Sequence, residues 1–191
     1  MTNSSTKGTL FVISGPSGVG KGTLVGMLRG KKPEISLSVS ATTRQPRPGE
    51  VDGTHYFFLT KEDFKNRVDA GEFLEWAEFS GNCYGTNKKF VEKSLNKGKN
   101  IILEIDVCGA LQVKNKMPEA VLIFIEPPSM EALKSRLFKR NTESEEEVQN
   151  RINIVKSEIE KKHEFNHVMV NDNLEEAYNT LENIILKEIN S

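Results

Sequence analysis

The sequence has little cysteine and no long apolar run. Its two cysteines, Cys83 and Cys108, stand 25 positions apart and belong to no paired-cysteine motif, which argues against a disulfide scaffold or a cysteine-bound zinc. The apolar runs are as short as Val121–Ile125, whereas a membrane span needs about 20 residues. Met1–Lys7 is polar and carries no secretion signal. We therefore exclude a membrane protein and expect a cytoplasmic one with reduced thiols.

An excess of charge of either sign is also missing. The 26 Lys and Arg residues against 27 Asp and Glu give a formal net charge of −1, so no cationic field is available to hold nucleic acid or an anionic membrane. Arginine is scarce among the basic residues, with seven in all, at positions 29, 44, 47, 67, 136, 140 and 151. Guanidinium groups bind phosphate through paired hydrogen bonds. Grouped arginines therefore favour phosphate recognition, although a general preference for lysine explains the scarcity equally well.

The order of apolar runs predicts one α/β domain. The length of 191 residues fits a single domain of about 100 to 200 residues. Buried strands are predicted at Thr9–Ser14, Ile101–Ile105, Val121–Ile125 and Val168–Val170. Helical patterns follow at Thr23–Leu28, Gly109–Lys116, Met130–Arg140, Glu145–Lys162 and Leu174–Ile189, the last after Asp172 or Asn173 as a cap. Such alternation predicts a parallel sheet covered by helices.

The segment from about residue 35 to residue 90 has a different texture. Thr, Ser, Phe and Tyr occur there in short alternating stretches, namely Ser36–Ser40, Tyr56–Leu59 and Phe73–Phe79. Alternation with a period of two is typical of strands with one buried face. We therefore expect an antiparallel insert between two parts of the parallel sheet.

A phosphate-binding loop follows the first predicted strand. Gly15–Lys21, read as Gly-Pro-Ser-Gly-Val-Gly-Lys, matches G-x-x-x-x-G-K between a strand and a helix, as that motif requires. Backbone N–H groups of such a loop cradle phosphate oxygens, and its lysine reaches the terminal phosphates. The candidate ATP-binding residues here are Gly15, Pro16, Ser17, Gly18, Val19, Gly20, Lys21, Gly22 and Thr23. Gly22 departs from the motif, which usually has a Ser or Thr hydroxyl for Mg²⁺ at that position, so a direct protein ligand for the metal is not assigned.

Two further segments carry a family resemblance. Ser38–Tyr56 places two arginines three positions apart with a tyrosine beyond them, and Phe73–Thr86 holds Glu-Trp-Ala-Glu-Phe and Cys-Tyr-Gly-Thr. Together with the phosphate loop, they make the chain resemble guanylate kinases, which move the γ-phosphoryl group of ATP onto GMP, and the resemblance runs from about Gly8 to Ile189. It implies a three-layer P-loop α/β fold with a parallel core sheet, an inserted mixed α/β GMP-binding region and a short helical lid. The single domain would span 8–189, with a core at about 8–34, 91–140 and 152–189, the insert at about 35–90 and the lid at about 141–151.

The resemblance also assigns the GMP site. It implies that the GMP phosphate is held by Arg44, Arg47, Tyr56 and Tyr84 with Ser40 nearby, and that guanine is read by Glu75 and Thr86. The chemistry fits, because guanine offers two N–H donor groups to an ionised carboxylate and an O6 acceptor to a hydroxyl, a pattern that adenine reverses. Asp106 resembles the family's aspartate near guanine and metal, and Glu104 would assist it from further away.

On the ATP side, the resemblance implies that arginines close over the phosphates. These are Arg136, Arg140 and Arg151, which together with Lys21 and Arg44 form the expected catalytic set. Asn171 is the expected adenine contact. The substrates would be ATP and GMP, with Mg²⁺ held mostly by nucleotide and water. No nucleic-acid or membrane partner is expected, and both a monomer and a homodimer remain open.

One residue, Cys108, and one motif, His163–His167, are interpreted as having no chemical role. Cys108 stands where the family often has glutamine, and we expect it to be a packing residue. His163–His167 matches the zinc-protease pattern H-E-x-x-H, but the helical pattern ends near His163 and His167 leads into an apolar run, so the two rings would not share a helix face.

Two other functions remain as alternatives. One is a non-catalytic guanylate-kinase-like scaffold that binds peptides, which an intact phosphate loop argues against. The other is a P-loop kinase for a different phosphorylated acceptor, which the Glu75 and Thr86 pair argues against.

Overall fold

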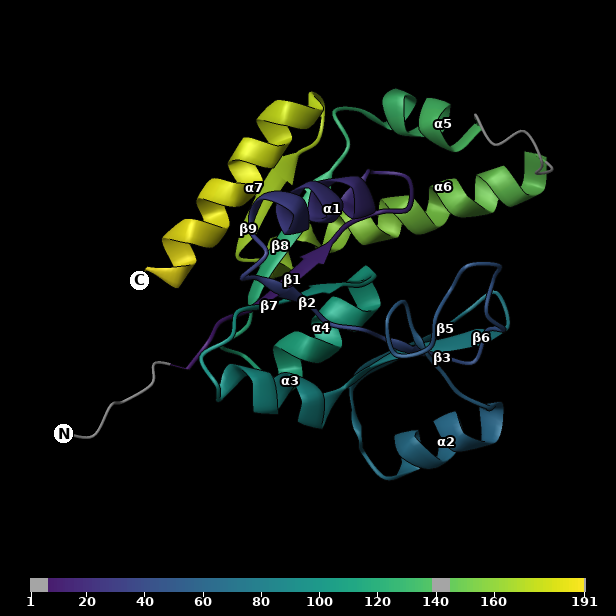
Figure 1. Ribbon diagram of the computed structural model, residues 1–191. Helices are drawn as coiled ribbons and strands as arrows, with labels where there is room; N and C mark the ends of the chain where they lie inside the picture. Colours follow the sequence, from purple (N-terminus) through teal and green to yellow (C-terminus); the bar gives the residue numbers. More distant parts are fainter. Residues whose placement is uncertain (1–6, 139–144, 191) are drawn as a thin grey trace.

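The computed structural model describes residues 7–138 and 145–190, and shows two sheets with helices around them (Figure 1). The core sheet has the strand order β2-β7-β1-β8-β9, and every neighbouring pair in it is parallel. Its strands are β1 (Leu10–Ser14), β2 (Ser36–Leu37), β7 (Ile101–Glu104), β8 (Val121–Glu126) and β9 (His167–Val170). The predicted parallel α/β core is therefore confirmed.

Helices cover both faces of the core sheet. They are α1 (Lys21–Lys31), α3 (Lys88–Leu95), α4 (Val107–Lys116), α5 (Met130–Phe138), α6 (Glu145–Glu160), the 3₁₀ turn η1 (Lys161–Glu164) and α7 (Leu174–Ile189). Side chains of β1 alternate between the faces, so Phe11 and Ile13 pack with α1 and α7 while Leu10 and Val12 pack with α3 and α4. Asn173, one of the two expected caps, accepts hydrogen bonds from the first turn of α7. Within the described residues, no helix is long and apolar enough to cross a bilayer.

The second sheet has the order β4-β3-β6-β5 and lies beside the core, with α2 packed on its outer side (Figure 1). Its elements are β3 (Ala41–Thr42), β4 (Phe57–Phe58), α2 (Lys61–Asp69), β5 (Phe73–Phe79) and β6 (Asn82–Asn87). Phe64 of α2 stacks on Phe73 of β5 at 4.5 Å between ring centroids, which gives this sheet a small apolar core of its own.

The alternating pattern predicted a purely antiparallel insert, and this part of the prediction was wrong. The pairs β3·β6 and β5·β6 are antiparallel, but β3·β4 is parallel. Ser36–Leu37, expected in the insert, instead forms β2 and pairs in parallel with β7 at the edge of the core sheet. Leu37 packs against the main core cluster, and a stretch this short shows the same alternation in either sheet.

Candidate active site

The phosphate loop joins the end of β1 to the start of α1. Gly15, Gly18 and Gly20 have φ values of 143°, 81° and 97°, in the region that favours glycine. A side chain at Gly15 would also overlap the carbonyl oxygen of Ile125 on β8. The loop is therefore held by its glycines in a conformation in which α1 begins at Lys21, and this places the positive end of the helix dipole at the loop.

Lys21 lies within this loop. Its Nζ donates hydrogen bonds to the carbonyl oxygens of Gly15 at 2.5 Å and Pro16 at 3.1 Å. Burial lowers the pKa of the Lys21 ammonium, while the negative charges of Glu158 and Glu104 act in the opposite direction. A desolvated cation is thus held beside the loop by short contacts, as a phosphate-binding lysine needs to be.

Asn171 supports the loop from behind. Its Nδ2 donates to the carbonyl oxygen of Val19 at 2.8 Å, and a side chain at Gly20 would come within 2.6 Å of the same nitrogen. Asn171 is only 6% exposed, and its own carbonyl oxygen accepts from Arg136 Nη2 at 3.1 Å. The side chain that the sequence assigned to adenine therefore contacts the loop, and its contact with the base stays a prediction.

The insert places a buried acidic residue opposite a hydroxyl. Glu75 on β5 and Thr86 on β6 are direct partners in the sheet register. Thr86 Oγ1 donates to Glu75 Oε1 at 2.6 Å, and the two residues are 0% and 4% exposed. Burial raises the pKa of Glu75 to about 7, and the charge of Asp106 acts in the same direction, whereas the bond from Thr86 lowers it. This carboxyl group therefore changes its charge near neutral pH.

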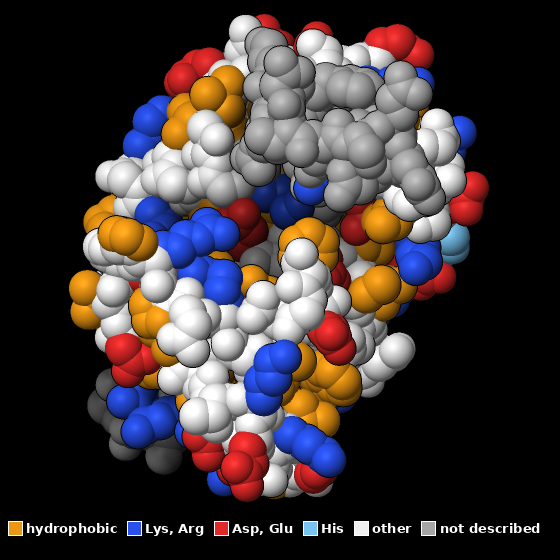
Figure 2. Space-filling model, turned by 90° about the vertical axis from the view of Figure 1, so that its right-hand side faces the viewer, with side chains coloured by type: hydrophobic (Ala, Val, Ile, Leu, Met, Phe, Trp, Pro, Cys, Tyr) orange, Lys and Arg blue, Asp and Glu red, His pale blue; other side chains and the backbone are white. Residues whose placement is uncertain are grey.

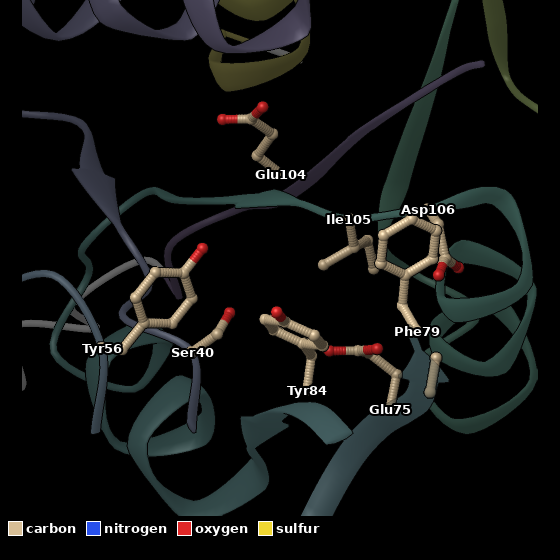
Figure 3. Close-up of a pocket in the computed structure, with 9 residues that line it drawn as sticks. Ser40, Tyr56, Glu75, Phe79, Tyr84, Glu104, Ile105 and Asp106 are labelled. Atoms are coloured by element: carbon tan, nitrogen blue, oxygen red, sulfur yellow. The ribbon is translucent and has the colours of Figure 1, made fainter. Parts of the chain in front are cut away.

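Hydroxyl groups and carboxylates surround an insert cavity of 260 Å³. Figure 3 shows the hydroxyls of Ser40, Tyr56 and Tyr84 directed into the space below Glu104. The described lining is Ser40, Tyr56, Glu75, Ala77, Phe79, Tyr84, Glu104, Ile105 and Asp106. Five of the eight GMP-site residues predicted from the sequence thus come together around one cavity.

Arg44 is held at this site by a residue that the sequence reasoning missed. Its Nη2 donates to both carboxylate oxygens of Glu50, at 2.8 and 3.0 Å, and its guanidinium lies 5.4 Å from the Tyr56 ring centroid. The backbone N–H of Arg47 also donates to Glu50, at 2.7 Å. The Arg44 hydrogen bond is the main cause that lowers the pKa of Glu50 to about 2. The signal available in the sequence was an acidic residue in the turn directly after the two arginines.

Two more cavities connect the insert to the phosphate loop. A middle cavity of 440 Å³ is lined by Gly15, Ser17, Lys21, Phe79, Glu104, Ile105, Asp106, Cys108, Arg151, Ile154, Val155 and Glu158. A loop cavity of 370 Å³ is lined by Ser17, Gly18, Gly20, Lys21, Gly22, Thr23, Glu104, Arg136 and Arg151. Glu104 lines all three cavities, so it marks the point where they meet. Figure 2 shows this region as a hollow with basic side chains grouped beside it.

Of the three arginines predicted on the ATP side, two lie among the residues that the structure describes and one lies outside them. Arg136 on α5 and Arg151 on α6 both line the loop cavity. Arg140 and residues 141–144 of the predicted lid lie outside the described residues, and residues 145–151 form the beginning of α6. Glu158, further along α6, lines the middle cavity, and burial raises its pKa to about 7. No sequence signal singled out Glu158, because helix α6 contains several acidic residues.

The expectation that Cys108 is a packing residue was wrong. Cys108 is exposed and lines the middle cavity in the first turn of α4. Val107, immediately before it, takes the inward position and is 0% exposed. Adjacent helix residues point about 100° apart, so with Val107 turned inward, Cys108 points away from the core.

The H-E-x-x-H pattern has the wrong geometry for zinc. His163 belongs to η1 and His167 to β9, and His167 Nε2 lies 2.8 Å from Glu188 on the terminal helix. Among the described residues, no group of three or more His, Cys, Asp or Glu side chains could hold a metal ion.

A carboxylate does stand beside the position where the loop lacks its hydroxyl. A Cβ atom at Gly22 would lie 3.3 Å from Glu104 Oε1, and burial raises the pKa of Glu104 while Lys21 lowers it. Mg²⁺ usually takes one or two carboxylates and completes its shell with phosphate and water. Glu104 and Asp106, which both line the insert and middle cavities, fit such an ion and provide no closed protein cage.

Comparisons with known proteins agree with this geometry. The sequence model of the family described as "Guanylate kinase" matches residues 7–188. The guanylate kinase of Clostridium perfringens (strain SM101 / Type A) is 54% identical over 182 residues, which cover 95% of this chain and 84% of the relative. That of Synechococcus sp. (strain JA-3-3Ab) is 48% identical over 181 residues, covering 95% of this chain and 83% of the relative.

A solved structure agrees as well. The crystal structure of guanylate kinase from Anaplasma phagocytophilum superposes with a TM-score of 0.77 at 34% sequence identity, covering 96% of this chain and 87% of that one. A family match over nearly the whole chain, close relatives and a shared three-dimensional structure lead to the same conclusion. The chain belongs to the guanylate kinase family.

Proposed function

We propose that this protein transfers the γ-phosphoryl group of ATP to GMP, with GMP in the insert cavity and the ATP phosphates on the phosphate loop. The observation that carries the proposal is the buried Glu75–Thr86 pair, in which Glu75 lines a cavity that is joined to the loop through Glu104. A carboxylate that accepts from guanine N1–H and N2–H₂ matches guanine and opposes adenine. The hydroxyl of Thr86, which donates to Glu75 in this structure, would turn its proton toward guanine O6 when the base binds. The same geometry predicts that dGMP is accepted, because these groups read the base.

The phosphate of GMP is assigned to the polar groups at the other end of the insert cavity. Arg44 would bind it together with Tyr56, Tyr84 and Ser40, whose hydroxyls are directed into that space. Arg44 already has two carboxylate contacts to Glu50 that fix its guanidinium. Arg47, an exposed side chain in the adjacent turn, would complete the phosphate contacts.

The donor side would hold ATP by charge. Lys21, Thr23 and residues of the phosphate loop line the loop cavity, and Arg136 and Arg151 line it from α5 and α6. Arginines around a transferring phosphoryl group stabilise the charge on its oxygens without covalent chemistry. The assignment of Arg140 to the same role rests on the sequence alone.

Mg²⁺ is proposed as the cofactor, held by the nucleotide, by water and by Glu104 or Asp106. When bound, it would neutralise charge on the ATP phosphates. The protein's own contribution is positioning: Arg44 would fix the GMP phosphate, Lys21 would fix the donor phosphates, and the cavities that meet at Glu104 would let the two approach each other. Closure of the insert over the cleft would exclude water and limit ATP hydrolysis. We place this reaction in the cytoplasm and leave both monomer and homodimer open.

A phosphoryl-transfer assay with a panel of acceptors tests the function. ADP formation from ATP and Mg²⁺ would be measured with GMP, dGMP, AMP, CMP and UMP in parallel. We expect turnover with GMP and dGMP and little with the other three. Turnover with a different acceptor would support a related kinase, and GMP binding without turnover would support the peptide-binding scaffold.

The raised pKa of Glu75 predicts a pH-dependent affinity for GMP. Only the ionised carboxylate accepts both guanine donors, so protonation below about pH 7 removes the binding form. We expect the Kd for GMP to rise by up to about tenfold for each pH unit below 7 and to level off above pH 8. Calorimetric titrations from pH 5.5 to 8.5 measure this.

A control is needed because the phosphate group of GMP also titrates near pH 6. The Glu75→Gln variant retains the phosphate contribution and lacks the carboxyl group, so its weaker binding should change less with pH. Parallel pH profiles for the wild type and this variant would contradict the assignment of the titration to Glu75.

A further inference from the structure

Helix α4 touches the guanine-reading carboxylate at a residue without a side chain. A Cβ atom built on Gly109 would lie 2.7 Å from Glu75 Oε2, which is closer than nonbonded carbon and oxygen atoms approach each other, and 3.4 Å from its Cδ. The backbone of Gly109 is helical and is not in the left-handed region. Its glycine is therefore required by the space that Glu75 occupies and not by backbone conformation.

Two glycines in the interior of helix α1 give a contrast. At Gly26 and Gly30 of α1, no atom lies within 4 Å of the position that a Cβ atom would take, whereas Gly109 is buried under Glu75. Glycine lowers helix stability relative to alanine, so a glycine in the first turn of α4 is unfavourable unless it serves a purpose. The close approach of the carboxylate supplies that purpose.

One helical turn further along α4, Gln112 holds the strand that carries Glu75. Its Nε2 donates to the carbonyl oxygen of Trp76 at 2.8 Å, and its Oε1 accepts from the Trp76 N–H at 3.2 Å. β5 is the edge strand of the insert sheet, so this paired contact with the side-chain amide replaces the contacts of a missing neighbouring strand. Residue 76 directly follows Glu75, and the bonds therefore fix the backbone from which the carboxylate extends.

We propose that Gly109 and Gln112 are specificity-determining positioning residues: Gly109 leaves the space for the Glu75 carboxylate, and Gln112 fixes its strand against the core. The inference rests on the proposed function and adds the means by which base recognition is set. Because the atom nearest to the missing Cβ is the end of a flexible side chain, a methyl group at 109 would displace the carboxylate and leave the backbone in place. Recognition of guanine should therefore be lost before the fold is.

The test compares Gly109→Ala with Gly26→Ala as a matched helix control. Each variant is assayed with GMP and with inosine 5′-monophosphate, which lacks the 2-amino group that Glu75 would bind. For Gly109→Ala we expect kcat/KM for GMP to fall about tenfold or more, mainly through KM. The preference for GMP over the inosine nucleotide should fall with it, while the KM for ATP stays unchanged and the Tm does not decrease. Gly26→Ala should keep the wild-type kcat/KM for both nucleotides, with a Tm that is equal or higher.

A general structural defect would lower activity with both nucleotides equally, so the ratio between them is decisive. Methionine has a similar length to glutamine and lacks its hydrogen-bonding amide, so Gln112→Met should lower the ratio of kcat/KM for GMP to that for the inosine nucleotide by about threefold. If Gly109→Ala does not fold, the result with Gln112→Met tests the inference by itself. An unchanged GMP preference in the folded variants, with wild-type GMP turnover intact, overturns the inference and leaves the proposed function standing. If the wild type does not phosphorylate GMP, both fall.

Discussion

Replacing Lys21 with methionine is expected to lower kcat for GMP phosphorylation by about three orders of magnitude. Methionine has a similar length and no charge, so the change removes the ammonium and keeps most of the packing. The ammonium is fixed by the carbonyl oxygens of Gly15 and Pro16, in the phosphate loop that joins β1 to α1. A charge held in that place stabilises the transferring phosphoryl group more than water could.

The measurement is steady-state ADP formation at saturating GMP and ATP, with Lys31→Met as the control. Lys31 ends the same helix, and its side chain is 51% exposed and paired with Glu175 across the surface. The control should keep its turnover. Because burial lowers the pKa of Lys21 and thus disfavours its charged form, the variant should not have a lower Tm. A Lys21→Met enzyme with undiminished kcat would contradict the role given to the loop.

The Glu75→Gln substitution is expected to have the second large effect. It should weaken the recognition of GMP without lowering the stability of the fold. The amide presents a donor to one of the two guanine donors, so we expect kcat/KM for GMP to fall by about 10³. Activity with AMP should stay at its wild-type level. Glu78→Gln, an exposed residue of the same strand β5, is the matched control and should leave both activities unchanged.

The same substitution should stabilise the protein at neutral and alkaline pH. The folded-state pKa of about 7 lies above the ordinary 4.5, so the folded protein binds this proton more tightly than the unfolded chain does. The free energy of unfolding therefore declines as the pH rises from 4.5 to 7, and removal of the group restores on the order of 1–3 kcal/mol above that window. Urea unfolding at pH 5 and pH 8 measures this. A variant less stable than the wild type at pH 8 would show that the buried carboxylate does not lower the free energy of unfolding.

Patterns that depend on local sequence were predicted well. The loop Gly15–Lys21, the four apolar strands and the terminal helix Leu174–Ile189 each depend on neighbouring residues, and the structure places them within a few residues of the predictions. The pairing of Glu75 with Thr86 was also available, through a resemblance that fixed both residues in one motif. Their opposed positions on β5 and β6 then followed from the sheet register.

Features that depend on contacts between distant segments were not predicted. Whether Ser36–Leu37 joined the core or the insert was decided by β7, more than 60 residues later. The exposure of Cys108 depended on which side of α4 faced the sheet, and Val107 took that position. Gly109 and Gln112 acquire a role only through β5, since nothing in their own neighbourhood distinguishes them from other helix residues.

The place of β1 in the core sheet has a consequence for the order in which the chain folds during synthesis. β1 pairs on both sides with strands made much later, β7 and β8. At ribosomal rates of about 5–20 residues per second, the roughly 90 residues between Ser14 and Glu104 take roughly 5–20 s to appear. During that interval the segment Leu10–Ser14, apolar apart from its last residue, has neither of its partner strands, so its apolar side chains wait for the sheet that buries them in the folded protein.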